Sequence, residues 1–154
     1  MFAIAHNAVG TGFQEGGDIP RAVEQYRLAL KLRPDFPEAL YNLGISMRES
    51  GNLSQSEENL RKALDLKPNY VDAIEALGYT LLLSGRFPEA IESFEKVLAV
   101  VPRNADANNG LGVAFAGRGD LEQAKVHFRA ALDIDPRHSE ANKNLQTLLK
   151  SSMP

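Results

Sequence analysis

The histidines are the first residues of this chain to weigh as catalytic groups or metal ligands. The chain has three of them, His6, His127 and His138, and no cysteine. They are far apart in the sequence, and no acidic residue accompanies them at the spacing of a metal site or a catalytic triad. The lack of cysteine excludes disulfides and thiolate ligands. We therefore expect no catalytic residue, no metal and no cofactor, with His6 packed in a core position and His127 facing water.

Glycine-rich loops and basic surfaces are the next candidates, because both bind phosphate groups. Gly117-Arg118-Gly119 comes nearest to a phosphate loop, but such a loop follows a strand, and this stretch is predicted to join two helices. The net charge is -3, and no dense basic run appears. Since nucleic-acid binding needs a basic stripe, we expect no nucleic-acid partner.

Four acidic residues recur every 34 residues: Glu38, Asp72, Asp106 and Glu140. A carboxylate in the first turn of a helix interacts favourably with the positive end of the helix dipole, which explains the column without any ligand. The same column could form an acidic rail for a basic partner. Both interpretations remain open at this point.

The period of 34 residues also organises the prolines and glycines, and so the elements that position these side chains. The columns are Pro34, Pro68, Pro102 and Pro136; Gly17, Gly51, Gly85 and Gly119; and Gly10, Gly44, Gly78 and Gly112. Leu40, Leu43 and Met47 lie on one helical face, and Gly51 can adopt the left-handed conformation that ends a helix. Each unit is therefore predicted to be a helix, a tight turn and a second helix, repeated as a solenoid.

The last glycine column falls inside the first helix of each unit. A glycine such as Gly44 has no side chain on the helix surface, so the second helix can approach closely. We expect a small residue, such as Ser56 or Ala63, to lie opposite Gly44. The contact between these two small residues would then set the angle between the two helices of the hairpin.

These residues resemble the tetratricopeptide repeat family. Its first-helix signature Trp-x2-Leu-Gly-x2-Tyr is matched by His6-x2-Val9-Gly10-x2-Phe13, Leu40-x2-Leu43-Gly44-x2-Met47, Ile74-x2-Leu77-Gly78-x2-Leu81 and Asn108-x2-Leu111-Gly112-x2-Phe115. Its second-helix alanine and aromatic residue fall on Ala22 and Tyr26, Ala90 and Phe94, and Ala124 and Phe128, whereas the second copy has Ser56 and Leu60. No copy carries the tryptophan. The resemblance covers residues 3–150 and implies an all-α fold, a right-handed α-solenoid with its first helices on the concave side.

We expect a single array over residues 1–154, with repeats at 3–36, 37–70, 71–104 and 105–138 and a capping helix at 139–150. The apolar residues Ala141, Leu145, Leu148 and Leu149 are expected to cover the last hairpin. Solenoid ends normally carry polar caps, but the first helix has none, so Phe2 and Ile4 are expected to be exposed. A partner at this end, upstream repeats of a longer protein and simple fraying all remain open.

The face of the first helices that points away from the core is the expected binding groove. It holds Asn7, Thr11, Tyr41, Asn42, Ile45, Arg48, Asp72, Glu75, Tyr79, Leu82, Leu83, Asn109 and Val113. Tyr79, Leu82 and Leu83, flanked by Ile45 and Val113, are expected to form an apolar patch that other repeats lack. The alternative that Leu82 and Leu83 pack between adjacent helices remains open. A partner is expected to anchor an aromatic or aliphatic side chain there, with Asp72 and Glu75 favouring a nearby basic group.

Two binding modes of the family are not matched. Asn42 is the only asparagine of its column in the four full repeats, beside Ala8, Ala76 and Gly110, so the ladder of asparagines that holds peptide backbones in some relatives is absent. The carboxylate clamp of chaperone-binding relatives is matched at Asn42 alone. We therefore expect no binding of acidic chaperone tails.

The sequence thus predicts a non-catalytic scaffold that binds a peptide segment or a protein in its groove. The alternatives are an accessory domain of a larger enzyme, such as a bacterial transferase, and self-association through Phe2, Ile4 and Phe13 at the N-terminal end. The start lacks the basic head and apolar run of a secretion signal, and no stretch approaches the about 18 apolar residues of a membrane span. We therefore expect a cytoplasmic protein without membrane insertion.

Overall fold

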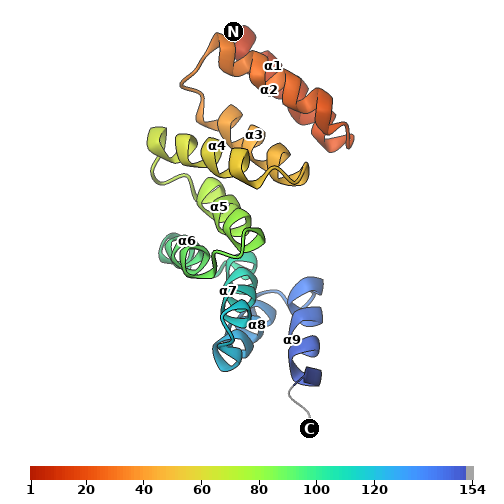
Figure 1. Ribbon diagram of the computed structural model, residues 1–154, viewed down its shortest axis with the longest axis vertical. Coiled ribbons are helices and arrows are strands. Elements are labelled where there is room, and N and C mark those ends of the chain that lie inside the picture. The colour runs from red at the N-terminus through yellow and green to blue at the C-terminus, as the bar shows by residue number, and fades with distance from the viewer. Residues whose placement is uncertain (152–154) are drawn as a thin grey trace. The chain divides into compact units, whose positions relative to one another are not determined.

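The computed structural model describes residues 1–151, and within them the chain forms nine α-helices and no strand (Figure 1). The helices are α1 (Phe2–Glu15), α2 (Ile19–Leu32), α3 (Pro37–Glu49), α4 (Leu53–Leu66), α5 (Val71–Leu83), α6 (Phe87–Val100), α7 (Ala105–Gly117), α8 (Leu121–Ile134) and α9 (Ser139–Ser151). The predicted all-α fold of helix-turn-helix repeats is confirmed.

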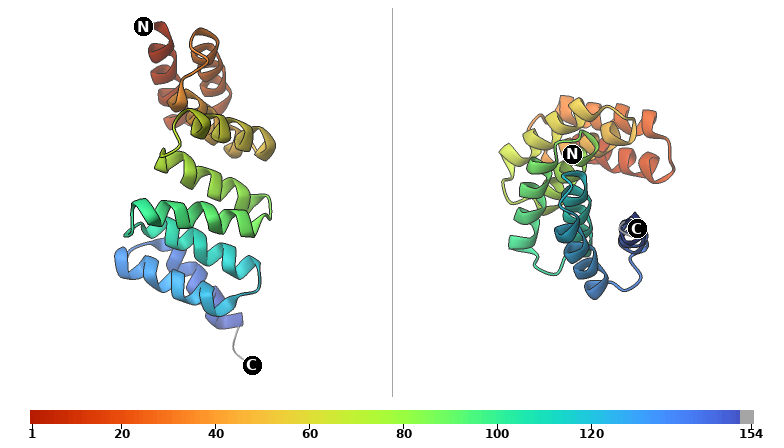
Figure 2. Two further views of the ribbon diagram at one scale, coloured as in Figure 1. Left: turned by 90° about the vertical axis from the view of Figure 1, so that its left-hand side faces the viewer. Right: turned by 60° about the horizontal axis from the view of Figure 1, so that its bottom comes forward.

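The helices fall into two compact units, which divide after Thr80 inside α5. In the first unit α1 and α2 form one hairpin, α3 and α4 form another, and α2 packs against α3 (Figures 1 and 2). In the second unit α7 packs against both α6 and α8, and α9 packs against α8. In addition α1 touches α3 and α7 touches α9, whereas no contact between α2 and α4 or between α6 and α8 is found in the described part of the chain. The first helices therefore line the inner side within each unit. That the two units continue as one array stays a prediction.

The turns inside the hairpins are closed by the predicted glycines. Gly17, Gly51, Gly85 and Gly119 have φ angles of 79°, 77°, 71° and 85°, a region that other residues rarely adopt. Around Gly51 the backbone N–H of Asn52 donates to the Met47 carbonyl at 2.8 Å, which closes the end of α3. The Asn52 side chain then accepts from the Gln55 N–H at 3.3 Å and caps α4. One turn thus ends a helix and starts the next.

The inner glycine column is where the structure corrects the sequence analysis. A Cβ atom on Gly44 would lie 2.8 Å from Cγ of Leu60, and one on Gly10 or Gly112 would lie 2.6 Å or 2.4 Å from the ring of Tyr26 or Phe128. Large side chains of the second helix therefore pack over these glycines. The expectation that a small residue lies opposite each glycine is wrong. The Ser56 carbonyl oxygen is also near, at 3.3 Å from the same Cβ position on Gly44.

The two ends of the described chain differ as predicted. Phe2 and Ile4 are 77% and 59% exposed, although α1 is a complete helix rather than a frayed one. At the other end α9 buries Ala141 and Leu148 against the preceding helices and turns polar residues outward. Leu149 was expected to join this contact, but it is 37% exposed and lies at its edge.

Candidate functional site

Six predicted groove residues come together in one pocket of the first unit. This α3–α5 pocket has a volume of about 190 Å³ and is lined by Tyr41, Ile45, Arg48, Asp72, Glu75 and Tyr79, with Ala76 completing the wall. Tyr41 and Glu75 occupy the same repeat position, as do Ile45 and Tyr79. The walls are therefore built from one helical face used twice, with different side chains on each side.

Cations and tyrosine rings pack together at this pocket. The Arg48 guanidinium carbon lies 5.9 Å from the ring centre of Tyr79, and Arg48 Nη1 donates to the Ala76 carbonyl at 3.4 Å. Beside the pocket Lys67 Nζ lies 4.3 Å from the ring centre of Tyr70. Both distances are within the about 6 Å over which a cation is attracted to a ring face.

Tyr70 packs beside Tyr41, a residue of the pocket wall, and was not predicted from the sequence. Its ring centre lies 5.2 Å from that of Tyr41. Burial, followed by the nearby Tyr41 and the charges of Asp72 and Glu38, raises the pKa of Tyr70 to about 12. Burial also raises the pKa of Tyr41, so both hydroxyls are neutral at physiological pH. Tyr70 precedes α5 and so falls outside a count of helical faces, although its repeat equivalent Phe36 is a buried aromatic residue.

A second pocket, of about 270 Å³, lies between α1 and α3. The predicted residues Thr11, Tyr41, Asn42 and Ile45 line this α1–α3 pocket together with Gln14, Glu15 and Tyr26, which were not predicted. Gln14 Oε1 accepts from the Tyr26 hydroxyl at 2.8 Å and from Ser46 Oγ at 3.3 Å. Gln14 thereby links the first hairpin to α3 by hydrogen bonds at the base of the pocket.

Asparagine pairs join neighbouring first helices at two equivalent places. Asn42 Nδ2 donates to Asn7 Oδ1 at 3.0 Å, and Asn144 Nδ2 donates to Asn109 Oδ1 at 3.1 Å. Asn109 was expected to be exposed in the groove, but α9 covers it and leaves it 2% exposed. Its role is therefore to hold α9 rather than to meet a partner from solution.

The remaining predicted residues, Leu82, Leu83 and Val113, belong to the second unit. Leu83 is 64% exposed and Leu82 is half-buried. Val113 is also half-buried, and it packs against the core cluster of Ala124, Phe128 and Leu148. A single apolar patch that joins them to Tyr79 stays a prediction.

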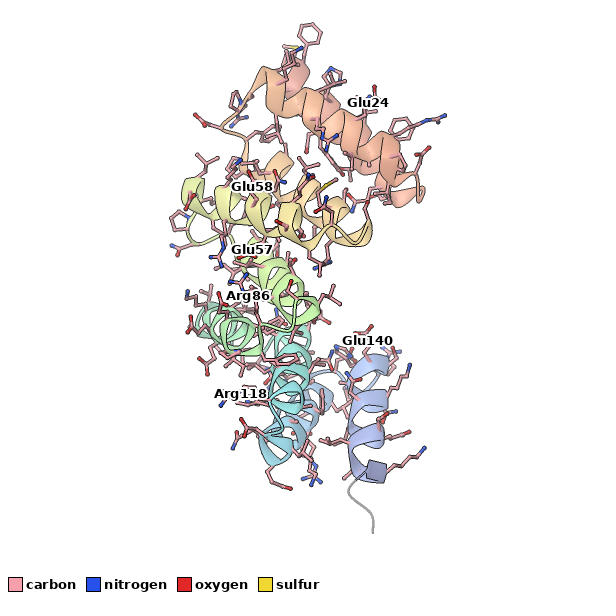
Figure 3. All side chains as sticks on the ribbon, viewed as in Figure 1. Glu24, Glu57, Glu58, Arg86, Arg118 and Glu140 are labelled. Atoms are coloured by element: carbon pink, nitrogen blue, oxygen red, sulfur yellow. The ribbon has the colours of Figure 1, made fainter. Side chains whose placement is uncertain are left out.

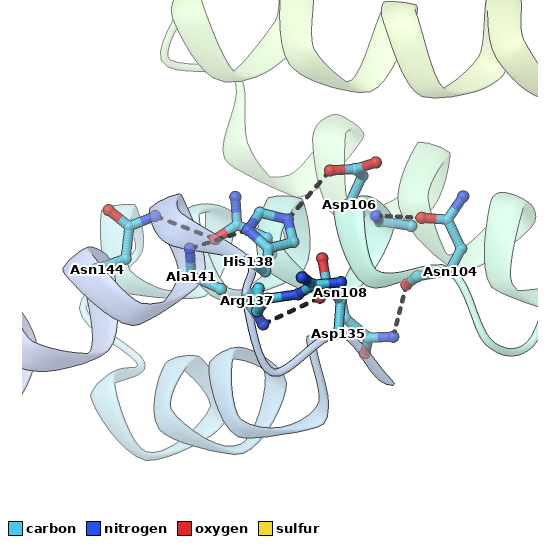
Figure 4. A network of polar contacts seen from close by, with 10 residues as sticks. Asn104, Asp106, Asn108, Asp135, Arg137, His138, Ala141 and Asn144 are labelled. Atoms are coloured by element: carbon cyan, nitrogen blue, oxygen red, sulfur yellow. Dashed lines mark hydrogen bonds and ion pairs between the residues drawn. The ribbon is translucent and has the colours of Figure 1, made fainter. Parts of the chain in front are cut away.

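His138 has an acidic partner that the sequence analysis did not find. Its Nε2 lies 3.0 Å from Asp106 Oδ1, and its Nδ1 accepts from the Ala141 N–H at 3.2 Å (Figure 4). The 34-residue period brings the starts of α7 and α9 side by side, which explains the contact. Because both ring nitrogens are engaged, His138 caps α9 and has no nitrogen left to activate a nucleophile. The column residue Glu38 is also paired, with Lys67 Nζ at 3.7 Å.

His127 was expected to face water, but it is half-buried. Its ring stacks on Phe115 with centres 5.3 Å apart and an interplanar angle of 7°, and its Nδ1 lies 3.2 Å from Asn108 Oδ1. Burial lowers the pKa of His127, with Glu95 opposing the effect. His6 was expected in a core position, but it too is only half-buried. It forms a similar contact, since its Nδ1 lies 2.7 Å from Gln25 Oε1 in the equivalent place of the first repeat.

We expect the chain to lose stability as the pH falls below about 6.5, partly because of His127. Since the pKa of His127 is lower in the folded state, the unfolded chain binds a proton first, and the stabilisation present above pH 6.5 is lost as the pH falls towards the folded pKa. Melting curves between about pH 7.5 and 5.5 should show a steeper decline for the wild type than for His127→Gln. Parallel declines would contradict this assignment.

Metal sites and membrane spans are two further features that would bear on function. Among residues 1–151 no group of three or more histidine, aspartate and glutamate side chains is placed to hold a metal ion. No helix in this range combines the length and the apolar character needed to cross a bilayer. The pockets on the first helices are therefore the features on which a functional proposal can rest.

Pairs of antiparallel helices at a 34-residue period, with pockets between the first helices, define a helical repeat protein. Three family models match: one described as TPR repeat at residues 13–48, and two described as tetratricopeptide repeat at residues 37–70 and 75–139. The chain belongs to the tetratricopeptide repeat family. The predicted resemblance is thereby confirmed over most of the chain.

Solved structures with the same fold cover nearly the whole chain. MamA from Desulfovibrio magneticus RS-1 (residues 41 to the end) has a TM-score of 0.87 at 25% identity, over 97% of this chain and 84% of that chain. TTC0263, a thermophilic TPR protein of Thermus thermophilus, has a TM-score of 0.83 at 22% identity, over 97% and 82%. A chain of the APC/C hetero-tetramer Cut9-Hcn1 has a TM-score of 0.91 at 17% identity, over 97% and 30%. A search of curated proteins finds no match.

Proposed function

We propose that this chain is a non-catalytic scaffold that binds a peptide segment or a protein along its first helices. The α3–α5 pocket is the observation that carries the proposal. It lies on the inner side of the first unit and exposes tyrosine rings beside charged groups, the composition that interface anchors require. The family itself serves protein interaction through such surfaces.

Tyr79 provides the test of this proposal. Tyr79→Ala removes a ring from the pocket, and truncation of a central anchor usually costs about 2 kcal/mol or more of binding free energy. Wild type, Tyr79→Ala and Val126→Ala, immobilised as full chains, should be compared in their capture of proteins from a lysate. Val126 is a matched control, because it is 56% exposed on the second helix α8.

The expected result is that Tyr79→Ala loses most captured protein while its melting temperature stays near that of the wild type. Val126→Ala should capture as the wild type does. Equal capture by the wild type and both variants would show that the binding surface does not include this pocket. A large fall in the melting temperature of Tyr79→Ala would place Tyr79 in the core instead.

Self-association through the N-terminal face is a second candidate. Ala39, Ala73, Ala107 and Ala141 share one repeat position and are all fully buried, whereas their equivalent Ala5 is exposed, as are Phe2 and Ile4 beside it. This uncovered side of α1 is the observation in its favour. Phe13, in contrast, packs against the core of the first unit and does not contribute. The accessory-domain alternative and the cytoplasmic location stay predictions.

A further inference from the structure

We propose that the α3–α5 pocket receives the lysine or arginine side chain of a basic partner segment. This inference rests on the proposed function, since it names the kind of segment that the first helices bind. The charge of the helices, the walls of the pocket and its size each support it.

The first helices of the first unit are acidic, whereas its second helices are not. Together α1, α3 and α5 carry five carboxylates and one guanidinium, namely Glu15, Glu38, Glu49, Asp72, Glu75 and Arg48. Of these carboxylates, Glu38 is paired with Lys67 Nζ at 3.7 Å. The second helices α2 and α4 carry five cations and four carboxylates. Some of these neutralise one another, as Arg61 does with Glu57 at 2.8 Å and Lys62 with Glu58 at 2.7 Å. A basic segment is therefore attracted to the first helices in preference to the other side.

The pocket walls supply the two groups that hold a cation, an aromatic face and a carboxylate. Tyr41 stands on α3 and Asp72 stands opposite on α5. In the described part of the chain no hydrogen bond or ion pair uses the Asp72 carboxylate, and this residue is exposed. Its charge acts on the pocket all the same, because Asp72 is the strongest electrostatic contributor to the raised pKa of Tyr41.

Arg48 shows that the same surface already holds a cation of the chain itself. Its guanidinium lies over Tyr79, and it donates to the Ala76 carbonyl. Arg48 is therefore hydrogen-bonded on the Tyr79 side, and its charge also reaches Tyr41, where it opposes the rise in pKa. Tyr41 and Asp72 remain as the walls for an incoming side chain. As the single cation on α1, α3 and α5, Arg48 gives little attraction for an acidic segment.

The size of the pocket suits one long side chain. Pockets for drug-sized ligands measure about 300–1,000 Å³, whereas this one measures about 190 Å³. A lysine or arginine can lay its methylene chain along Tyr41 and Ile45 while its charge reaches Asp72. The partner is thus a peptide segment with a projecting basic residue rather than a free small molecule.

Peptide selection tests the inference. The full chain should be used to select from a displayed library of random ten-residue peptides, and the binding constant of the best peptide should be measured against four proteins. These are the wild type, Asp72→Asn, Asp72→Glu and Glu24→Gln. Glu24 is an exposed carboxylate on the second helix α2, so Glu24→Gln makes the same change of charge away from the pocket (Figure 3).

The expected result is enrichment of lysine or arginine at one peptide position, and at least tenfold weaker binding to Asp72→Asn. Asp72→Glu should restore most of the affinity, and Glu24→Gln should bind as the wild type does. Replacing the enriched basic residue of the peptide by glutamine should abolish the difference between the wild type and Asp72→Asn.

Two outcomes overturn the inference. If the selected peptides show no preference for a basic residue, the pocket binds another kind of side chain. The scaffold function would not be contradicted by that result. Equal weakening by Asp72→Asn and Glu24→Gln would show that net charge alone attracts the peptide. The capture experiment with Tyr79→Ala is independent of peptide charge, so failure of the scaffold function itself would appear there.

Discussion

Gly112→Leu is expected to lower the free energy of unfolding by about 3 kcal/mol, at the upper end of what overpacking usually costs. A Cβ atom on Gly112 would lie 2.4 Å from Cε1 of Phe128, and that ring is only 2% exposed. That ring is packed in the core cluster with Ala124 and Leu148, so the leucine is expected to push α7 and α8 apart. Urea denaturation of the full chain, followed by circular dichroism, measures the loss.

Gly12→Leu is the matched control, because Gly12 also lies inside a first helix. A Cβ atom there meets no other atom within 4 Å. Leucine has a higher helix propensity than glycine, which ranks about 0.8–1 kcal/mol below alanine, so this variant should be as stable as the wild type or more so. If both leucines have the same effect, the inner glycine column is not a packing contact.

The helices and turns of this fold could be predicted because each depends on local chemistry that recurs every 34 residues. Gly51 illustrates this, since a glycine after an apolar helical face is a local signal and its φ of 77° agrees with it. The partner of Gly44 could not be predicted in the same way. Leu60 reaches it only after the hairpin has closed, and the sequence does not show how far that side chain extends across the contact.

The candidate site was predicted where it depends on helical periodicity and missed where it depends on the next repeat. Tyr41 and Tyr79 follow from counting faces, and they line the α3–α5 pocket. Tyr70 lies just before α5, so a count of residues along the helical faces does not include it. Asn109 has the right periodicity but is covered by α9, and the contact of Asp106 with His138 likewise depends on how α9 packs.

Gly110 lies in the column of Asn42, and the packing gives a physical reason why it has no side chain. A Cβ atom on Gly110 would lie 2.4 Å from Cζ of Phe94 in the preceding hairpin. An asparagine like Asn42 therefore cannot stand at this position while Phe94 is present. Phe94 takes the space into which an asparagine side chain at position 110 would extend.

Phe94→Ala is therefore expected to destabilise the chain by about 3–5 kcal/mol, the usual cost of removing a buried aromatic ring. Phe94 is fully buried, and its ring tip fills the notch over Gly110 between α6 and α7. Phe94→Leu should lose less, because Leu60 holds the equivalent position of the second repeat and is also fully buried. Urea denaturation of both variants checks this order.

A double-mutant cycle identifies the contact behind the loss. Gly110→Ala should destabilise the wild type, because the added methyl group meets the Phe94 ring, but it should be neutral or stabilising in Phe94→Ala, where that space is empty. The two changes are thus expected to couple with a favourable sign. Additive effects would mean that Phe94 stabilises the second unit through other neighbours, and that Gly110 is free to accept an asparagine.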